Sequence, residues 1–449
     1  MRAAPPVLPG STHTAESPLD RALSLAMAEE RDTALRWTAA LVKSHPSMPA
    51  ALCLCGRLLG ELGRHQIARE TCSLAVTRAI DVENLPLAVA AAQELARFGG
   101  DPNPKLDLIA EAFCKGSPRL TSGVLPPPPL SPTPSFQPLP SVVTGVALLG
   151  KTTEIVHAAE KQLAQMAASP SLNALPLFSS IGRAGLRGLC GAFKTIWVPQ
   201  GSTLIKQGAA GSEAYFVARG ELEVRRGREE EFAVLARLTN GEIFGEMALF
   251  SRAPRAGSVV ATRPSIVVEV TREALDKLTE QEPDVGVEIA AHCRDRMFHN
   301  LVRMSDLLKV VPSANRPAFI ERFQTRTFEK NERLLVQNET PPGLFLIASG
   351  EVAVVRREEP EGDPLVLTTL GPGDVVGEVA MVLRRKANAE VIAVHPTVTL
   401  YLPSTEFMGL IRAHPTILAE LYQLAVTRDE ETKIIIEEEA SVAEDFVLV

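Results

Sequence analysis

The 449-residue sequence predicts a multidomain α+β protein, with N-terminal α-helical hairpins followed by two β-roll (jelly-roll) domains with flanking helices. Three observations lead to this fold class. Apolar residues keep a helical spacing over residues 19–115, and short β-like runs between glycines take over from Trp197 to Val270. The same order of runs then recurs after about residue 308. A chain of this length is expected to form about three domains.

With 45% apolar and 22% charged residues, the chain has ample material for packed interiors. No apolar run approaches the roughly 18 residues of a membrane span, and the N-terminus lacks the apolar region of a secretory signal. The six cysteines show no CxxC spacing and no matching histidine pairs. Buried, reduced thiols in a cytoplasmic protein are therefore expected, and no metal site.

Residues 1–18 are expected to be disordered, and residues 19–116 to form a helical domain whose hairpins turn at Gly63 and at Gly99-Gly100. Part of this domain resembles a tetratricopeptide helix–turn–helix unit. The residues that carry the resemblance are Leu58, Leu59, Gly60, Leu62, Gly63, Ala68 and Ala75. Aromatic signature positions and a clean 34-residue period are missing, so an ordinary small helical bundle remains an alternative. Either one is an interaction or packing module.

A proline-rich linker is predicted over residues 117–150, because residues 117–140 contain nine prolines, including Pro126 to Pro129. Proline fixes φ and removes a hydrogen-bond donor, which excludes a helix or a central strand and favours a semi-rigid connection. The segment is either a plain spacer or a polyproline ligand for a partner domain. A helix over Thr152–Ala168 is then expected to lead into the first roll.

Two tandem copies of one β-roll are predicted over residues 151–309 and 310–427. The run from Tyr215 to Leu222 corresponds to the run from Phe345 to Val352, and Gly241–Glu246 corresponds to Gly373–Glu378. The offset changes by only two residues, which the charged hairpin around 356–364 absorbs. Repetition of one supersecondary unit explains both copies.

The first copy contains a glycine-led turn into a short predicted helix, Gly245 to Leu249, and an arginine at position 255. A glycine lets the backbone approach a ligand closely, and the amides at a helix N-terminus suit an anionic phosphodiester. Arg255 would add a planar, two-pronged donor for the phosphate. Ala256 and Gly257 are small and leave room for a buried ring.

The whole string FGEMALFSRAPRAGSV, residues 244–259, resembles the phosphate-binding cassette of cyclic-nucleotide-binding domains, as in the regulatory subunits of cAMP-dependent protein kinase and the catabolite activator family. The resemblance covers about residues 175–300, with a weaker copy over 308–430. It implies that Glu246 accepts a hydrogen bond from the ribose 2′-hydroxyl. The candidate site consists of Phe244, Gly245, Glu246, Met247, Ala248, Arg255, Ala256, Gly257 and Ser258.

The resemblance also bears on which nucleotide is bound. Family members selective for cGMP tend to have a threonine just after the arginine, where this chain has Ala256. The expected ligand is therefore cAMP rather than cGMP, with cyclic dinucleotides left open.

The second cassette is degenerate. Gly377, Glu378, Val379 and Ala380 keep the turn and the acid, but Ala387 stands where Arg255 is expected and Glu390 where Ser258 is. Losing a desolvated arginine–phosphate pair costs about 2–5 kcal/mol. Arg385 or Lys386 would restore a cation after a register shift, Lys386 only as a point charge. The second roll is thus expected to be structural, with residual nucleotide binding as the alternative.

No effector machinery is evident. The chain has no kinase signature, no GxxxxGK[ST] loop and no helix-turn-helix with a basic recognition helix. The tandem layout is similar to the kinase regulatory subunits, but their inhibitory Arg-Arg-x-Ser/Ala segment is missing from residues 101–174. We therefore expect a non-enzymatic regulatory protein that binds cAMP and transmits a helix rearrangement to an unidentified protein partner, a kinase or another effector. A ligand-free scaffold is the alternative.

The net charge of −8 is concentrated at the C-terminus, since residues 428–449 contain eight acids and two bases. The rest of the chain is near neutral, which argues against a nucleic-acid surface. An acidic tail of this kind is expected to be a solvated extension, although Ile434, Ile435 and Ile436 leave a docking segment open.

Overall fold

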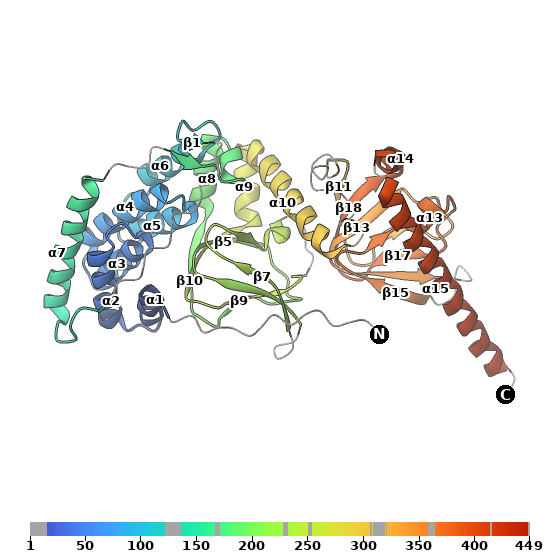
Figure 1. Cartoon of the computed structure of the whole chain (residues 1–449), viewed down its shortest axis with the longest axis horizontal. Helices are drawn as coiled ribbons and strands as arrows, with labels where there is room; N and C mark the ends of the chain where they lie inside the picture. Colours follow the sequence, from blue (N-terminus) through green and yellow to red (C-terminus); the bar gives the residue numbers. More distant parts are fainter. Residues whose placement is uncertain are drawn as a thin grey trace.

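The computed structural model describes residues 16–121, 136–166, 171–227, 232–249, 254–305, 308, 319, 321–357, 364–413 and 415–447. The N-terminal helices lie at one end of an elongated molecule, the first roll in the middle and the second roll at the other end (Figure 1). Pro126–Pro129 lie outside the described residues, so the structure does not test whether they form a polyproline ligand. In the part of the chain that is described, no helix is long and apolar enough to cross a membrane.

Seven helices of the described chain form the N-terminal end. They are α1 (Pro18–Met27), α2 (Arg31–Ser44), α3 (Pro49–Glu61), α4 (His65–Asp81), α5 (Leu85–Arg97), α6 (Asn103–Phe113) and α7 (Gly145–Ala164). Left-handed residues at positions 29, 63 and 99 follow α1, α3 and α5, 34 and 36 residues apart. Helices α3 and α4 pack closely at Gly56. A Cβ at this position would lie 2.5 Å from Cys72 Sγ, so only a glycine allows this approach. The tetratricopeptide likeness stays a prediction.

Helix α7 belongs with these helices, whereas the sequence groups residues from 151 onward with the first roll. Its apolar face, which includes Ile155 and Val156, is buried in the same core as α2. The preceding segment also lies along α2, since the Phe136 ring is 5.5 Å from the Trp37 ring and the Leu139 amide donates to the Arg36 carbonyl over 3.3 Å. The described end of the linker is therefore packed rather than a free spacer.

The first roll consists of two four-stranded sheets, with strand orders β3-β10-β5-β8 and β4-β9-β6-β7. Its elements are η1 (Phe178–Ser180), α8 (Arg183–Ala192), β3 (Lys194–Val198), β4 (Thr203–Ile205), β5 (Glu213–Arg219), β6 (Leu222–Gly227), β7 (Phe232–Leu238), β8 (Ile243–Phe244), η2 (Glu246–Leu249), β9 (Ser258–Ala261), β10 (Ser265–Thr271), α9 (Arg272–Gln281) and α10 (Pro283–Met304). A short parallel pair, β1 (Leu120–Thr121) and β2 (Leu172–Asn173), precedes it.

The second roll repeats the same strand orders, β11-β18-β13-β16 and β12-β17-β14-β15, which confirms the predicted fold class. Its elements are β11 (Gln324–Phe328), β12 (Arg333–Leu335), β13 (Gly343–Ser349), β14 (Val352–Arg356), β15 (Leu365–Leu370), β16 (Val375–Val376), α13 (Glu378–Val382), β17 (Glu390–Ala393), β18 (Thr397–Pro403), α14 (Ser404–Ala413) and α15 (Pro415–Val447). The backbone amide of Arg255 donates to Ala209 and that of Ala387 to Glu339, both over 2.9 Å. Ala387 therefore occupies the place of Arg255.

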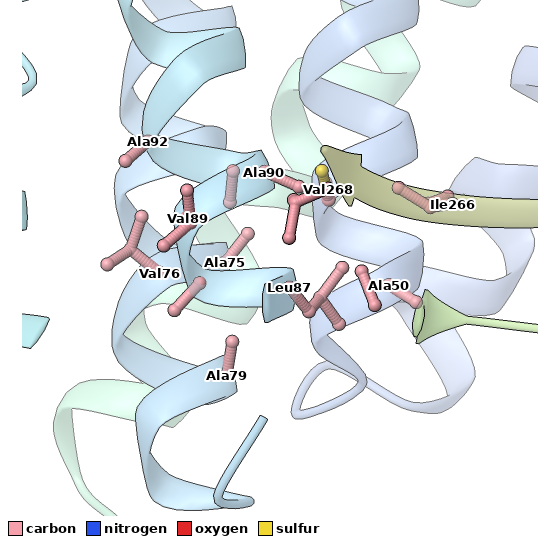
Figure 2. Close-up of a cluster of buried hydrophobic side chains, with 14 of the residues drawn as sticks. Ala50, Ala75, Val76, Ala79, Leu87, Val89, Ala90, Ala92, Ile266 and Val268 are labelled. Carbon is pink, nitrogen blue, oxygen red and sulfur yellow. The ribbon is translucent and has the colours of Figure 1, made fainter. Parts of the chain in front are cut away.

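The helical domain packs directly on the outer face of the first roll. Side chains alternate along a strand, so Ala214, Phe216 and Ala218 of β5 join the core of the helices, while Tyr215 and Val217 face the interior of the roll. Figure 2 shows Ile266 and Val268 of β10 beside the helices. Because both faces of the sheet are buried, the helical domain and the first roll share one core.

Helix α10 connects the two rolls and belongs to both. Val285, Ile289 and Cys293 lie in the core of the first roll and the helical domain, whereas Met297 and Phe298 lie in the core of the second roll. In Figure 1 this helix runs from one roll to the other. The sequence predicts a domain boundary at residue 309. The structure shows that the second half of α10, before that boundary, already belongs to the core of the second roll.

The acidic C-terminal segment continues helix α15 rather than leaving the fold at residue 428. Ile417, Leu421 and Ala425 are buried against the second roll. Arg428, Thr432 and Ile435 lie over its cassette. The expectation of a solvated extension is therefore wrong for residues 428–435, because one face of this helix is apolar or paired.

A buried ion cluster anchors α1 to the first roll. The Asp20 carboxylate is 3% exposed, pairs with Arg219 and accepts from Arg263 Nε over 2.9 Å. Burial alone would raise the pKa of the Asp20 carboxyl, but Arg219, Arg263 and Ser17 together lower it below its ordinary 3.8. This stabilising contribution is therefore fully present above that value and is lost as the pH falls through the lowered pKa.

The substitution Asp20→Asn is expected to lower the free energy of unfolding by about 3 kcal/mol, because it leaves Arg219 buried with an uncompensated charge. Urea unfolding monitored by tryptophan fluorescence measures this effect, since Trp197 donates to Glu94 between the helical domain and the first roll. Glu273→Gln, at an exposed pair with Lys277, is the control and should change nothing measurable. Equal midpoints for Asp20→Asn and the control would contradict the prediction.

Candidate ligand-binding site

The cassette of the first roll begins at the end of β8. Gly245 has a φ of +72°, a left-handed conformation that favours glycine. A Cβ at this position would lie 2.8 Å from Arg255 Nη1 and 3.1 Å from the Glu213 carbonyl oxygen. The turn then leads into η2, which is a 3₁₀ turn with its amides at the start of Glu246–Leu249. Glycine is thus required both by backbone conformation and by close approach.

The Arg255 guanidinium lies inside the roll, with its side chain only 8% exposed. Nη1 donates to the Gly245 carbonyl over 2.9 Å, and Nη2 donates to the Glu213 carbonyl over 2.9 Å and to its carboxylate over 3.0 Å. Charge-assisted hydrogen bonds of this kind fix both position and orientation. The arginine is therefore held next to the Gly245 turn before any anion arrives.

The Glu246 carboxylate is also buried and has a basic neighbour on another element. It is 6% exposed, and Arg296 Nε of α10 lies 3.6 Å from its Oε1. This distance is that of an ion pair rather than of a hydrogen bond. The acid of the cassette is thus linked to the helix that joins the two rolls.

These groups surround one cavity of about 320 Å³, at the lower end of the size range of small-molecule sites. All predicted site residues except Ser258 line it. Its lining includes Gly245, Glu246, Arg255 and Arg296, together with Ala348 and Ser349 from the second roll. Ser258 instead pairs with Arg225 at the start of β9, and its hydroxyl accepts from the backbone amide of Gln207 over 2.9 Å.

Sequence reasoning missed Glu213, Arg296 and Ser349, because each approaches the cassette from a distant part of the chain. One signal for Arg296 was present. Arg296 follows Glu246 by 50 residues, and Arg428 follows Glu378 by the same interval in the second copy. Both pairs are in contact. A repeated acid–arginine spacing between two copies indicates a shared ion pair.

The second cassette keeps the backbone and changes its partners. Gly377 has a φ of +92°, and Glu378 is 2% exposed at the start of α13. Arg428 Nη1 of α15 lies 2.6 Å from Glu378 Oε1. Burial raises the pKa of the Glu378 carboxyl, against the opposing effect of Arg428.

The space at the second cassette is only about 100 Å³. Its lining includes Gly377, Glu378, Val379, Ala380 and Ala387, together with Arg428, Glu431, Thr432 and Ile435 of α15. Lys386 is exposed and Arg385 pairs with Asp429, so neither lines this space. The buried Glu390 pairs with Arg333 and lies 3.8 Å from Arg357. The arginine that does line this space, Arg428, pairs with Glu378, and position 387 itself is an alanine.

Comparisons with known proteins match the two rolls. Residues 195–282 and 325–414 match the model of the cyclic nucleotide-binding domain. The cGMP-dependent protein kinase 2 of Homo sapiens is 29% identical over 194 residues, which cover 43% of this chain and 24% of the kinase. The chain therefore spans about a quarter of the length of this relative, and the Rattus norvegicus enzyme gives the same coverage at 28% identity.

Two solved structures are similar as well. The regulatory domain of Toxoplasma gondii PKA with cAMP is 23% identical, covers 56% of this chain and 92% of that chain, and has a TM-score of 0.29. The catabolite activator protein of Thermus thermophilus is 29% identical, covers 30% of this chain and 63% of that chain, and has a TM-score of 0.27.

The substitution Arg428→Ala is expected to destabilise the second roll by about 3 kcal/mol, since it leaves the Glu378 carboxylate buried without its partner. The raised pKa means that the protonated acid is the form better tolerated in the interior. The penalty should therefore be largest at neutral pH and shrink as the pH falls toward 4.5, the ordinary value for this group.

Urea unfolding of the full chain at two pH values measures this effect. Lys433→Ala is the matched control on the same helix, because Lys433 is 65% exposed and pairs with Asp429 at the surface. A loss for Arg428→Ala that equals the loss for Lys433→Ala, or that does not change with pH, would show that the buried pair contributes little.

Proposed function

We propose that this chain is a regulatory protein that binds a cyclic nucleotide in its first roll and passes the binding on to a protein partner, because both rolls match the model of the cyclic nucleotide-binding domain. The observation that carries this proposal is the buried guanidinium of Arg255, held beside the Gly245 turn at the edge of a cavity. The proposal concerns regulation and no catalytic step.

The chemistry of the first cassette fits a cyclic phosphodiester. A phosphate entering the cavity would accept hydrogen bonds from Arg255 and from the amides at the start of η2. Little reorganisation is needed, since Gly245 and Glu213 already hold the guanidinium in place. The Glu246 carboxylate is then available to accept from a ribose hydroxyl, in exchange for its loose contact with Arg296.

We favour cAMP over cGMP on the basis of Ala256, which lines the cavity and has no hydroxyl for a guanine amino group. The human and rat relatives are named as cGMP-dependent kinases, so cGMP is the direct competitor in any binding experiment. Of the two rolls, the first is the proposed binder. The second has an alanine, Ala387, in place of the arginine, and its own helix α15 lines the space of about 100 Å³ that remains at the cassette.

The route from binding to output is α10. When the ribose takes Glu246, Arg296 loses its partner at the cassette, and the balance between two positions of α10 shifts. The C-terminal half of α10 lies in the core of the second roll, so the shift changes how the two rolls meet. A partner protein that contacts both rolls, a kinase or another effector, would respond to that change.

A ligand-free scaffold is the second candidate. The observation that favours it is the set of contacts around Arg255, whose two Nη atoms already donate to Glu213 and Gly245. In a scaffold these contacts are permanent and the cavity serves no ligand. Binding measurements separate the two functions.

The first prediction from this proposal concerns the phosphate. Arg255→Ala is expected to weaken cAMP binding by about thirtyfold to several thousandfold, the effect of losing a desolvated arginine–phosphate pair. Isothermal titration calorimetry of the full chain with cAMP and cGMP measures this change. The control is Arg237→Ala, which removes a 62% exposed arginine of the same roll and should leave the affinity unchanged. If the wild-type chain shows no binding of either nucleotide at high concentration, the ligand-free scaffold is the better account.

The second prediction concerns the ribose. Glu246→Ala should weaken cAMP binding by roughly tenfold to a hundredfold, the effect of a hydrogen bond to a charged group. The same substitution should have almost no effect on 2′-deoxy-cAMP, which lacks the hydroxyl that Glu246 would accept from. Equal losses for the two nucleotides would mean that Glu246 acts on the fold of the cassette and not on the ribose.

A further inference from the structure

Strand β6 has a charged side chain on the face that points into the first roll. Side chains alternate along a strand, and Leu222 and Val224 of β6 pack in the interior of the roll. Arg226 is the next residue of this inward row. It lines the cavity of about 320 Å³ together with Val224, Glu246 and Arg255. A guanidinium therefore lies where the pattern of the strand predicts an apolar side chain.

The neighbouring arginine of β6 faces the other way. Arg225 donates to the Glu223 carboxylate over 2.9 Å, and its guanidinium carbon lies 4.4 Å from the centroid of the Phe232 ring. Neither Arg225 nor Glu223 lines the cavity. Two consecutive arginines thus have different surroundings, because Arg225 has a carboxylate and an aromatic ring beside it and Arg226 lies at the cavity.

Arg226 has one contact to the cassette. Its Nε donates over 3.4 Å to the carbonyl oxygen of Ala256, the residue after Arg255. Among the residues that the structure describes, no carboxylate oxygen lies within 4 Å of this guanidinium, and its two Nη atoms make no hydrogen bond. Most of its N–H donors therefore remain for a ligand in the cavity.

The charges around the cavity balance when a singly charged anion is bound. The charged residues that line it are Arg226, Arg255, Arg296 and Glu246. Arg255 pairs with Glu213 over 3.0 Å, and Arg296 lies 3.6 Å from Glu246. Two of these arginines thus already have a carboxylate, and Arg226 supplies the positive charge that is left. A cyclic phosphodiester carries one negative charge, so its binding would leave the cavity neutral.

We propose that Arg226 is a second phosphate-binding arginine of the first roll, which donates to the phosphate of the bound nucleotide alongside Arg255. This inference rests on the proposed function. A guanidinium donates and never accepts, so it suits the two non-bridging oxygens of a cyclic phosphate. Its attraction for an anion is also stronger in a partly buried cavity than in open water.

The second roll has the same arginine without the same place at a cavity. Val352 and Val354 of β14 pack in its interior, and Arg356 is the next residue of that row. Arg356 does not line the space of about 100 Å³ at the second cassette, where Ala387 occupies the place of Arg255. The inward arginine thus lies at the cavity only in the roll that also keeps the cassette arginine, as expected if both serve one anion.

The test is isothermal titration calorimetry of the full chain with cAMP and cGMP, which share the phosphate and differ in the base. Arg226→Ala is expected to weaken both nucleotides by the same factor, roughly tenfold to a hundredfold, the effect of a hydrogen bond to a charged group. Arg226→Lys should recover part of this loss, because a lysine keeps the charge without the planar fork.

The matched control is Arg225→Ala, which removes the adjacent arginine on the other face of the strand. Both affinities should stay unchanged in this variant. The Glu223 carboxylate keeps a partner there, since Arg237 lies 3.4 Å from it.

The outcomes separate the two proposals. If Arg226→Ala binds cAMP as tightly as the wild-type chain does, the second phosphate contact is wrong while the proposed function stands. If Arg226→Ala weakens one nucleotide much more than the other, Arg226 contacts the base, and the phosphate contact is again overturned. If the wild-type chain binds neither nucleotide, the proposed function itself fails, and this inference fails with it.

A phosphate contact also predicts an effect of salt, which needs only one bound nucleotide. Added salt screens the attraction between a partly exposed arginine and an anion. The affinity of the wild-type chain for cAMP should therefore fall more steeply with salt concentration than the affinity of Arg226→Ala. Equal salt dependence of the two chains would overturn the contact.

Thermal unfolding separates binding from a structural role of Arg226. Because no carboxylate pairs with this arginine in the part of the chain that is described, Arg226→Leu should not lower the midpoint of the ligand-free chain. The rise of the midpoint on addition of cAMP should shrink in this variant, since weaker binding stabilises the folded chain less. A lowered midpoint without ligand, together with an unchanged rise, would show that Arg226 supports the fold and does not bind the phosphate.

Discussion

The burial of helix α10 in two different cores is the constraint on which the arrangement of the rolls depends. Its first half packs with the first roll and the helical domain, through Val285, Ile289 and Cys293. Its second half, including Phe298, which is fully buried, packs with the second roll. Separating the rolls would expose apolar surface on one half or the other, so hydrophobic burial of α10 ties the two rolls together.

Arginines from the following helices meet the cassette acids in both rolls, but the two contacts differ. Glu378 and Arg428 lie 2.6 Å apart beside a space of about 100 Å³, whereas Glu246 and Arg296 lie 3.6 Å apart beside a cavity of about 320 Å³. A buried carboxylate is stabilised only when its charge has a partner. In the second roll, Arg428 of α15 is a close partner for Glu378. In the first roll, Arg296 of α10 is a more distant partner for Glu246. The same duplicated pair is therefore a tight contact beside a small space in the second roll and a looser contact beside a larger cavity in the first.

The N-terminal helices are part of the same physical unit as the first roll. Trp197 of β3 donates to Glu94 over 3.1 Å. The Arg57 guanidinium carbon lies over the Trp197 ring, 4.3 Å from the ring centroid. Asn84 donates to the Ala218 carbonyl over 2.8 Å, at the far end of β5 from Glu213. One face of β5 packs against the helical domain, and the first residue of the strand, Glu213, pairs with Arg255 of the cassette. The helices therefore contact the same sheet that holds the cassette arginine.

Local pattern was sufficient for the features that depend on neighbouring residues. Short β-like runs between glycines, repeated in the same order, predicted the two rolls. The resemblance of residues 244–259 to a phosphate-binding cassette predicted Gly245, Glu246 and Arg255, which meet around one cavity because they are close in sequence. Tertiary structure alone decided which groups pair with them. Glu213 reaches Arg255, Ala348 and Pro372 of the second roll line the cavity, and α7 and α15 pack back onto earlier elements. Such contacts join residues tens or hundreds of positions apart, and their selection depends on which apolar faces and buried charges the whole fold must cover.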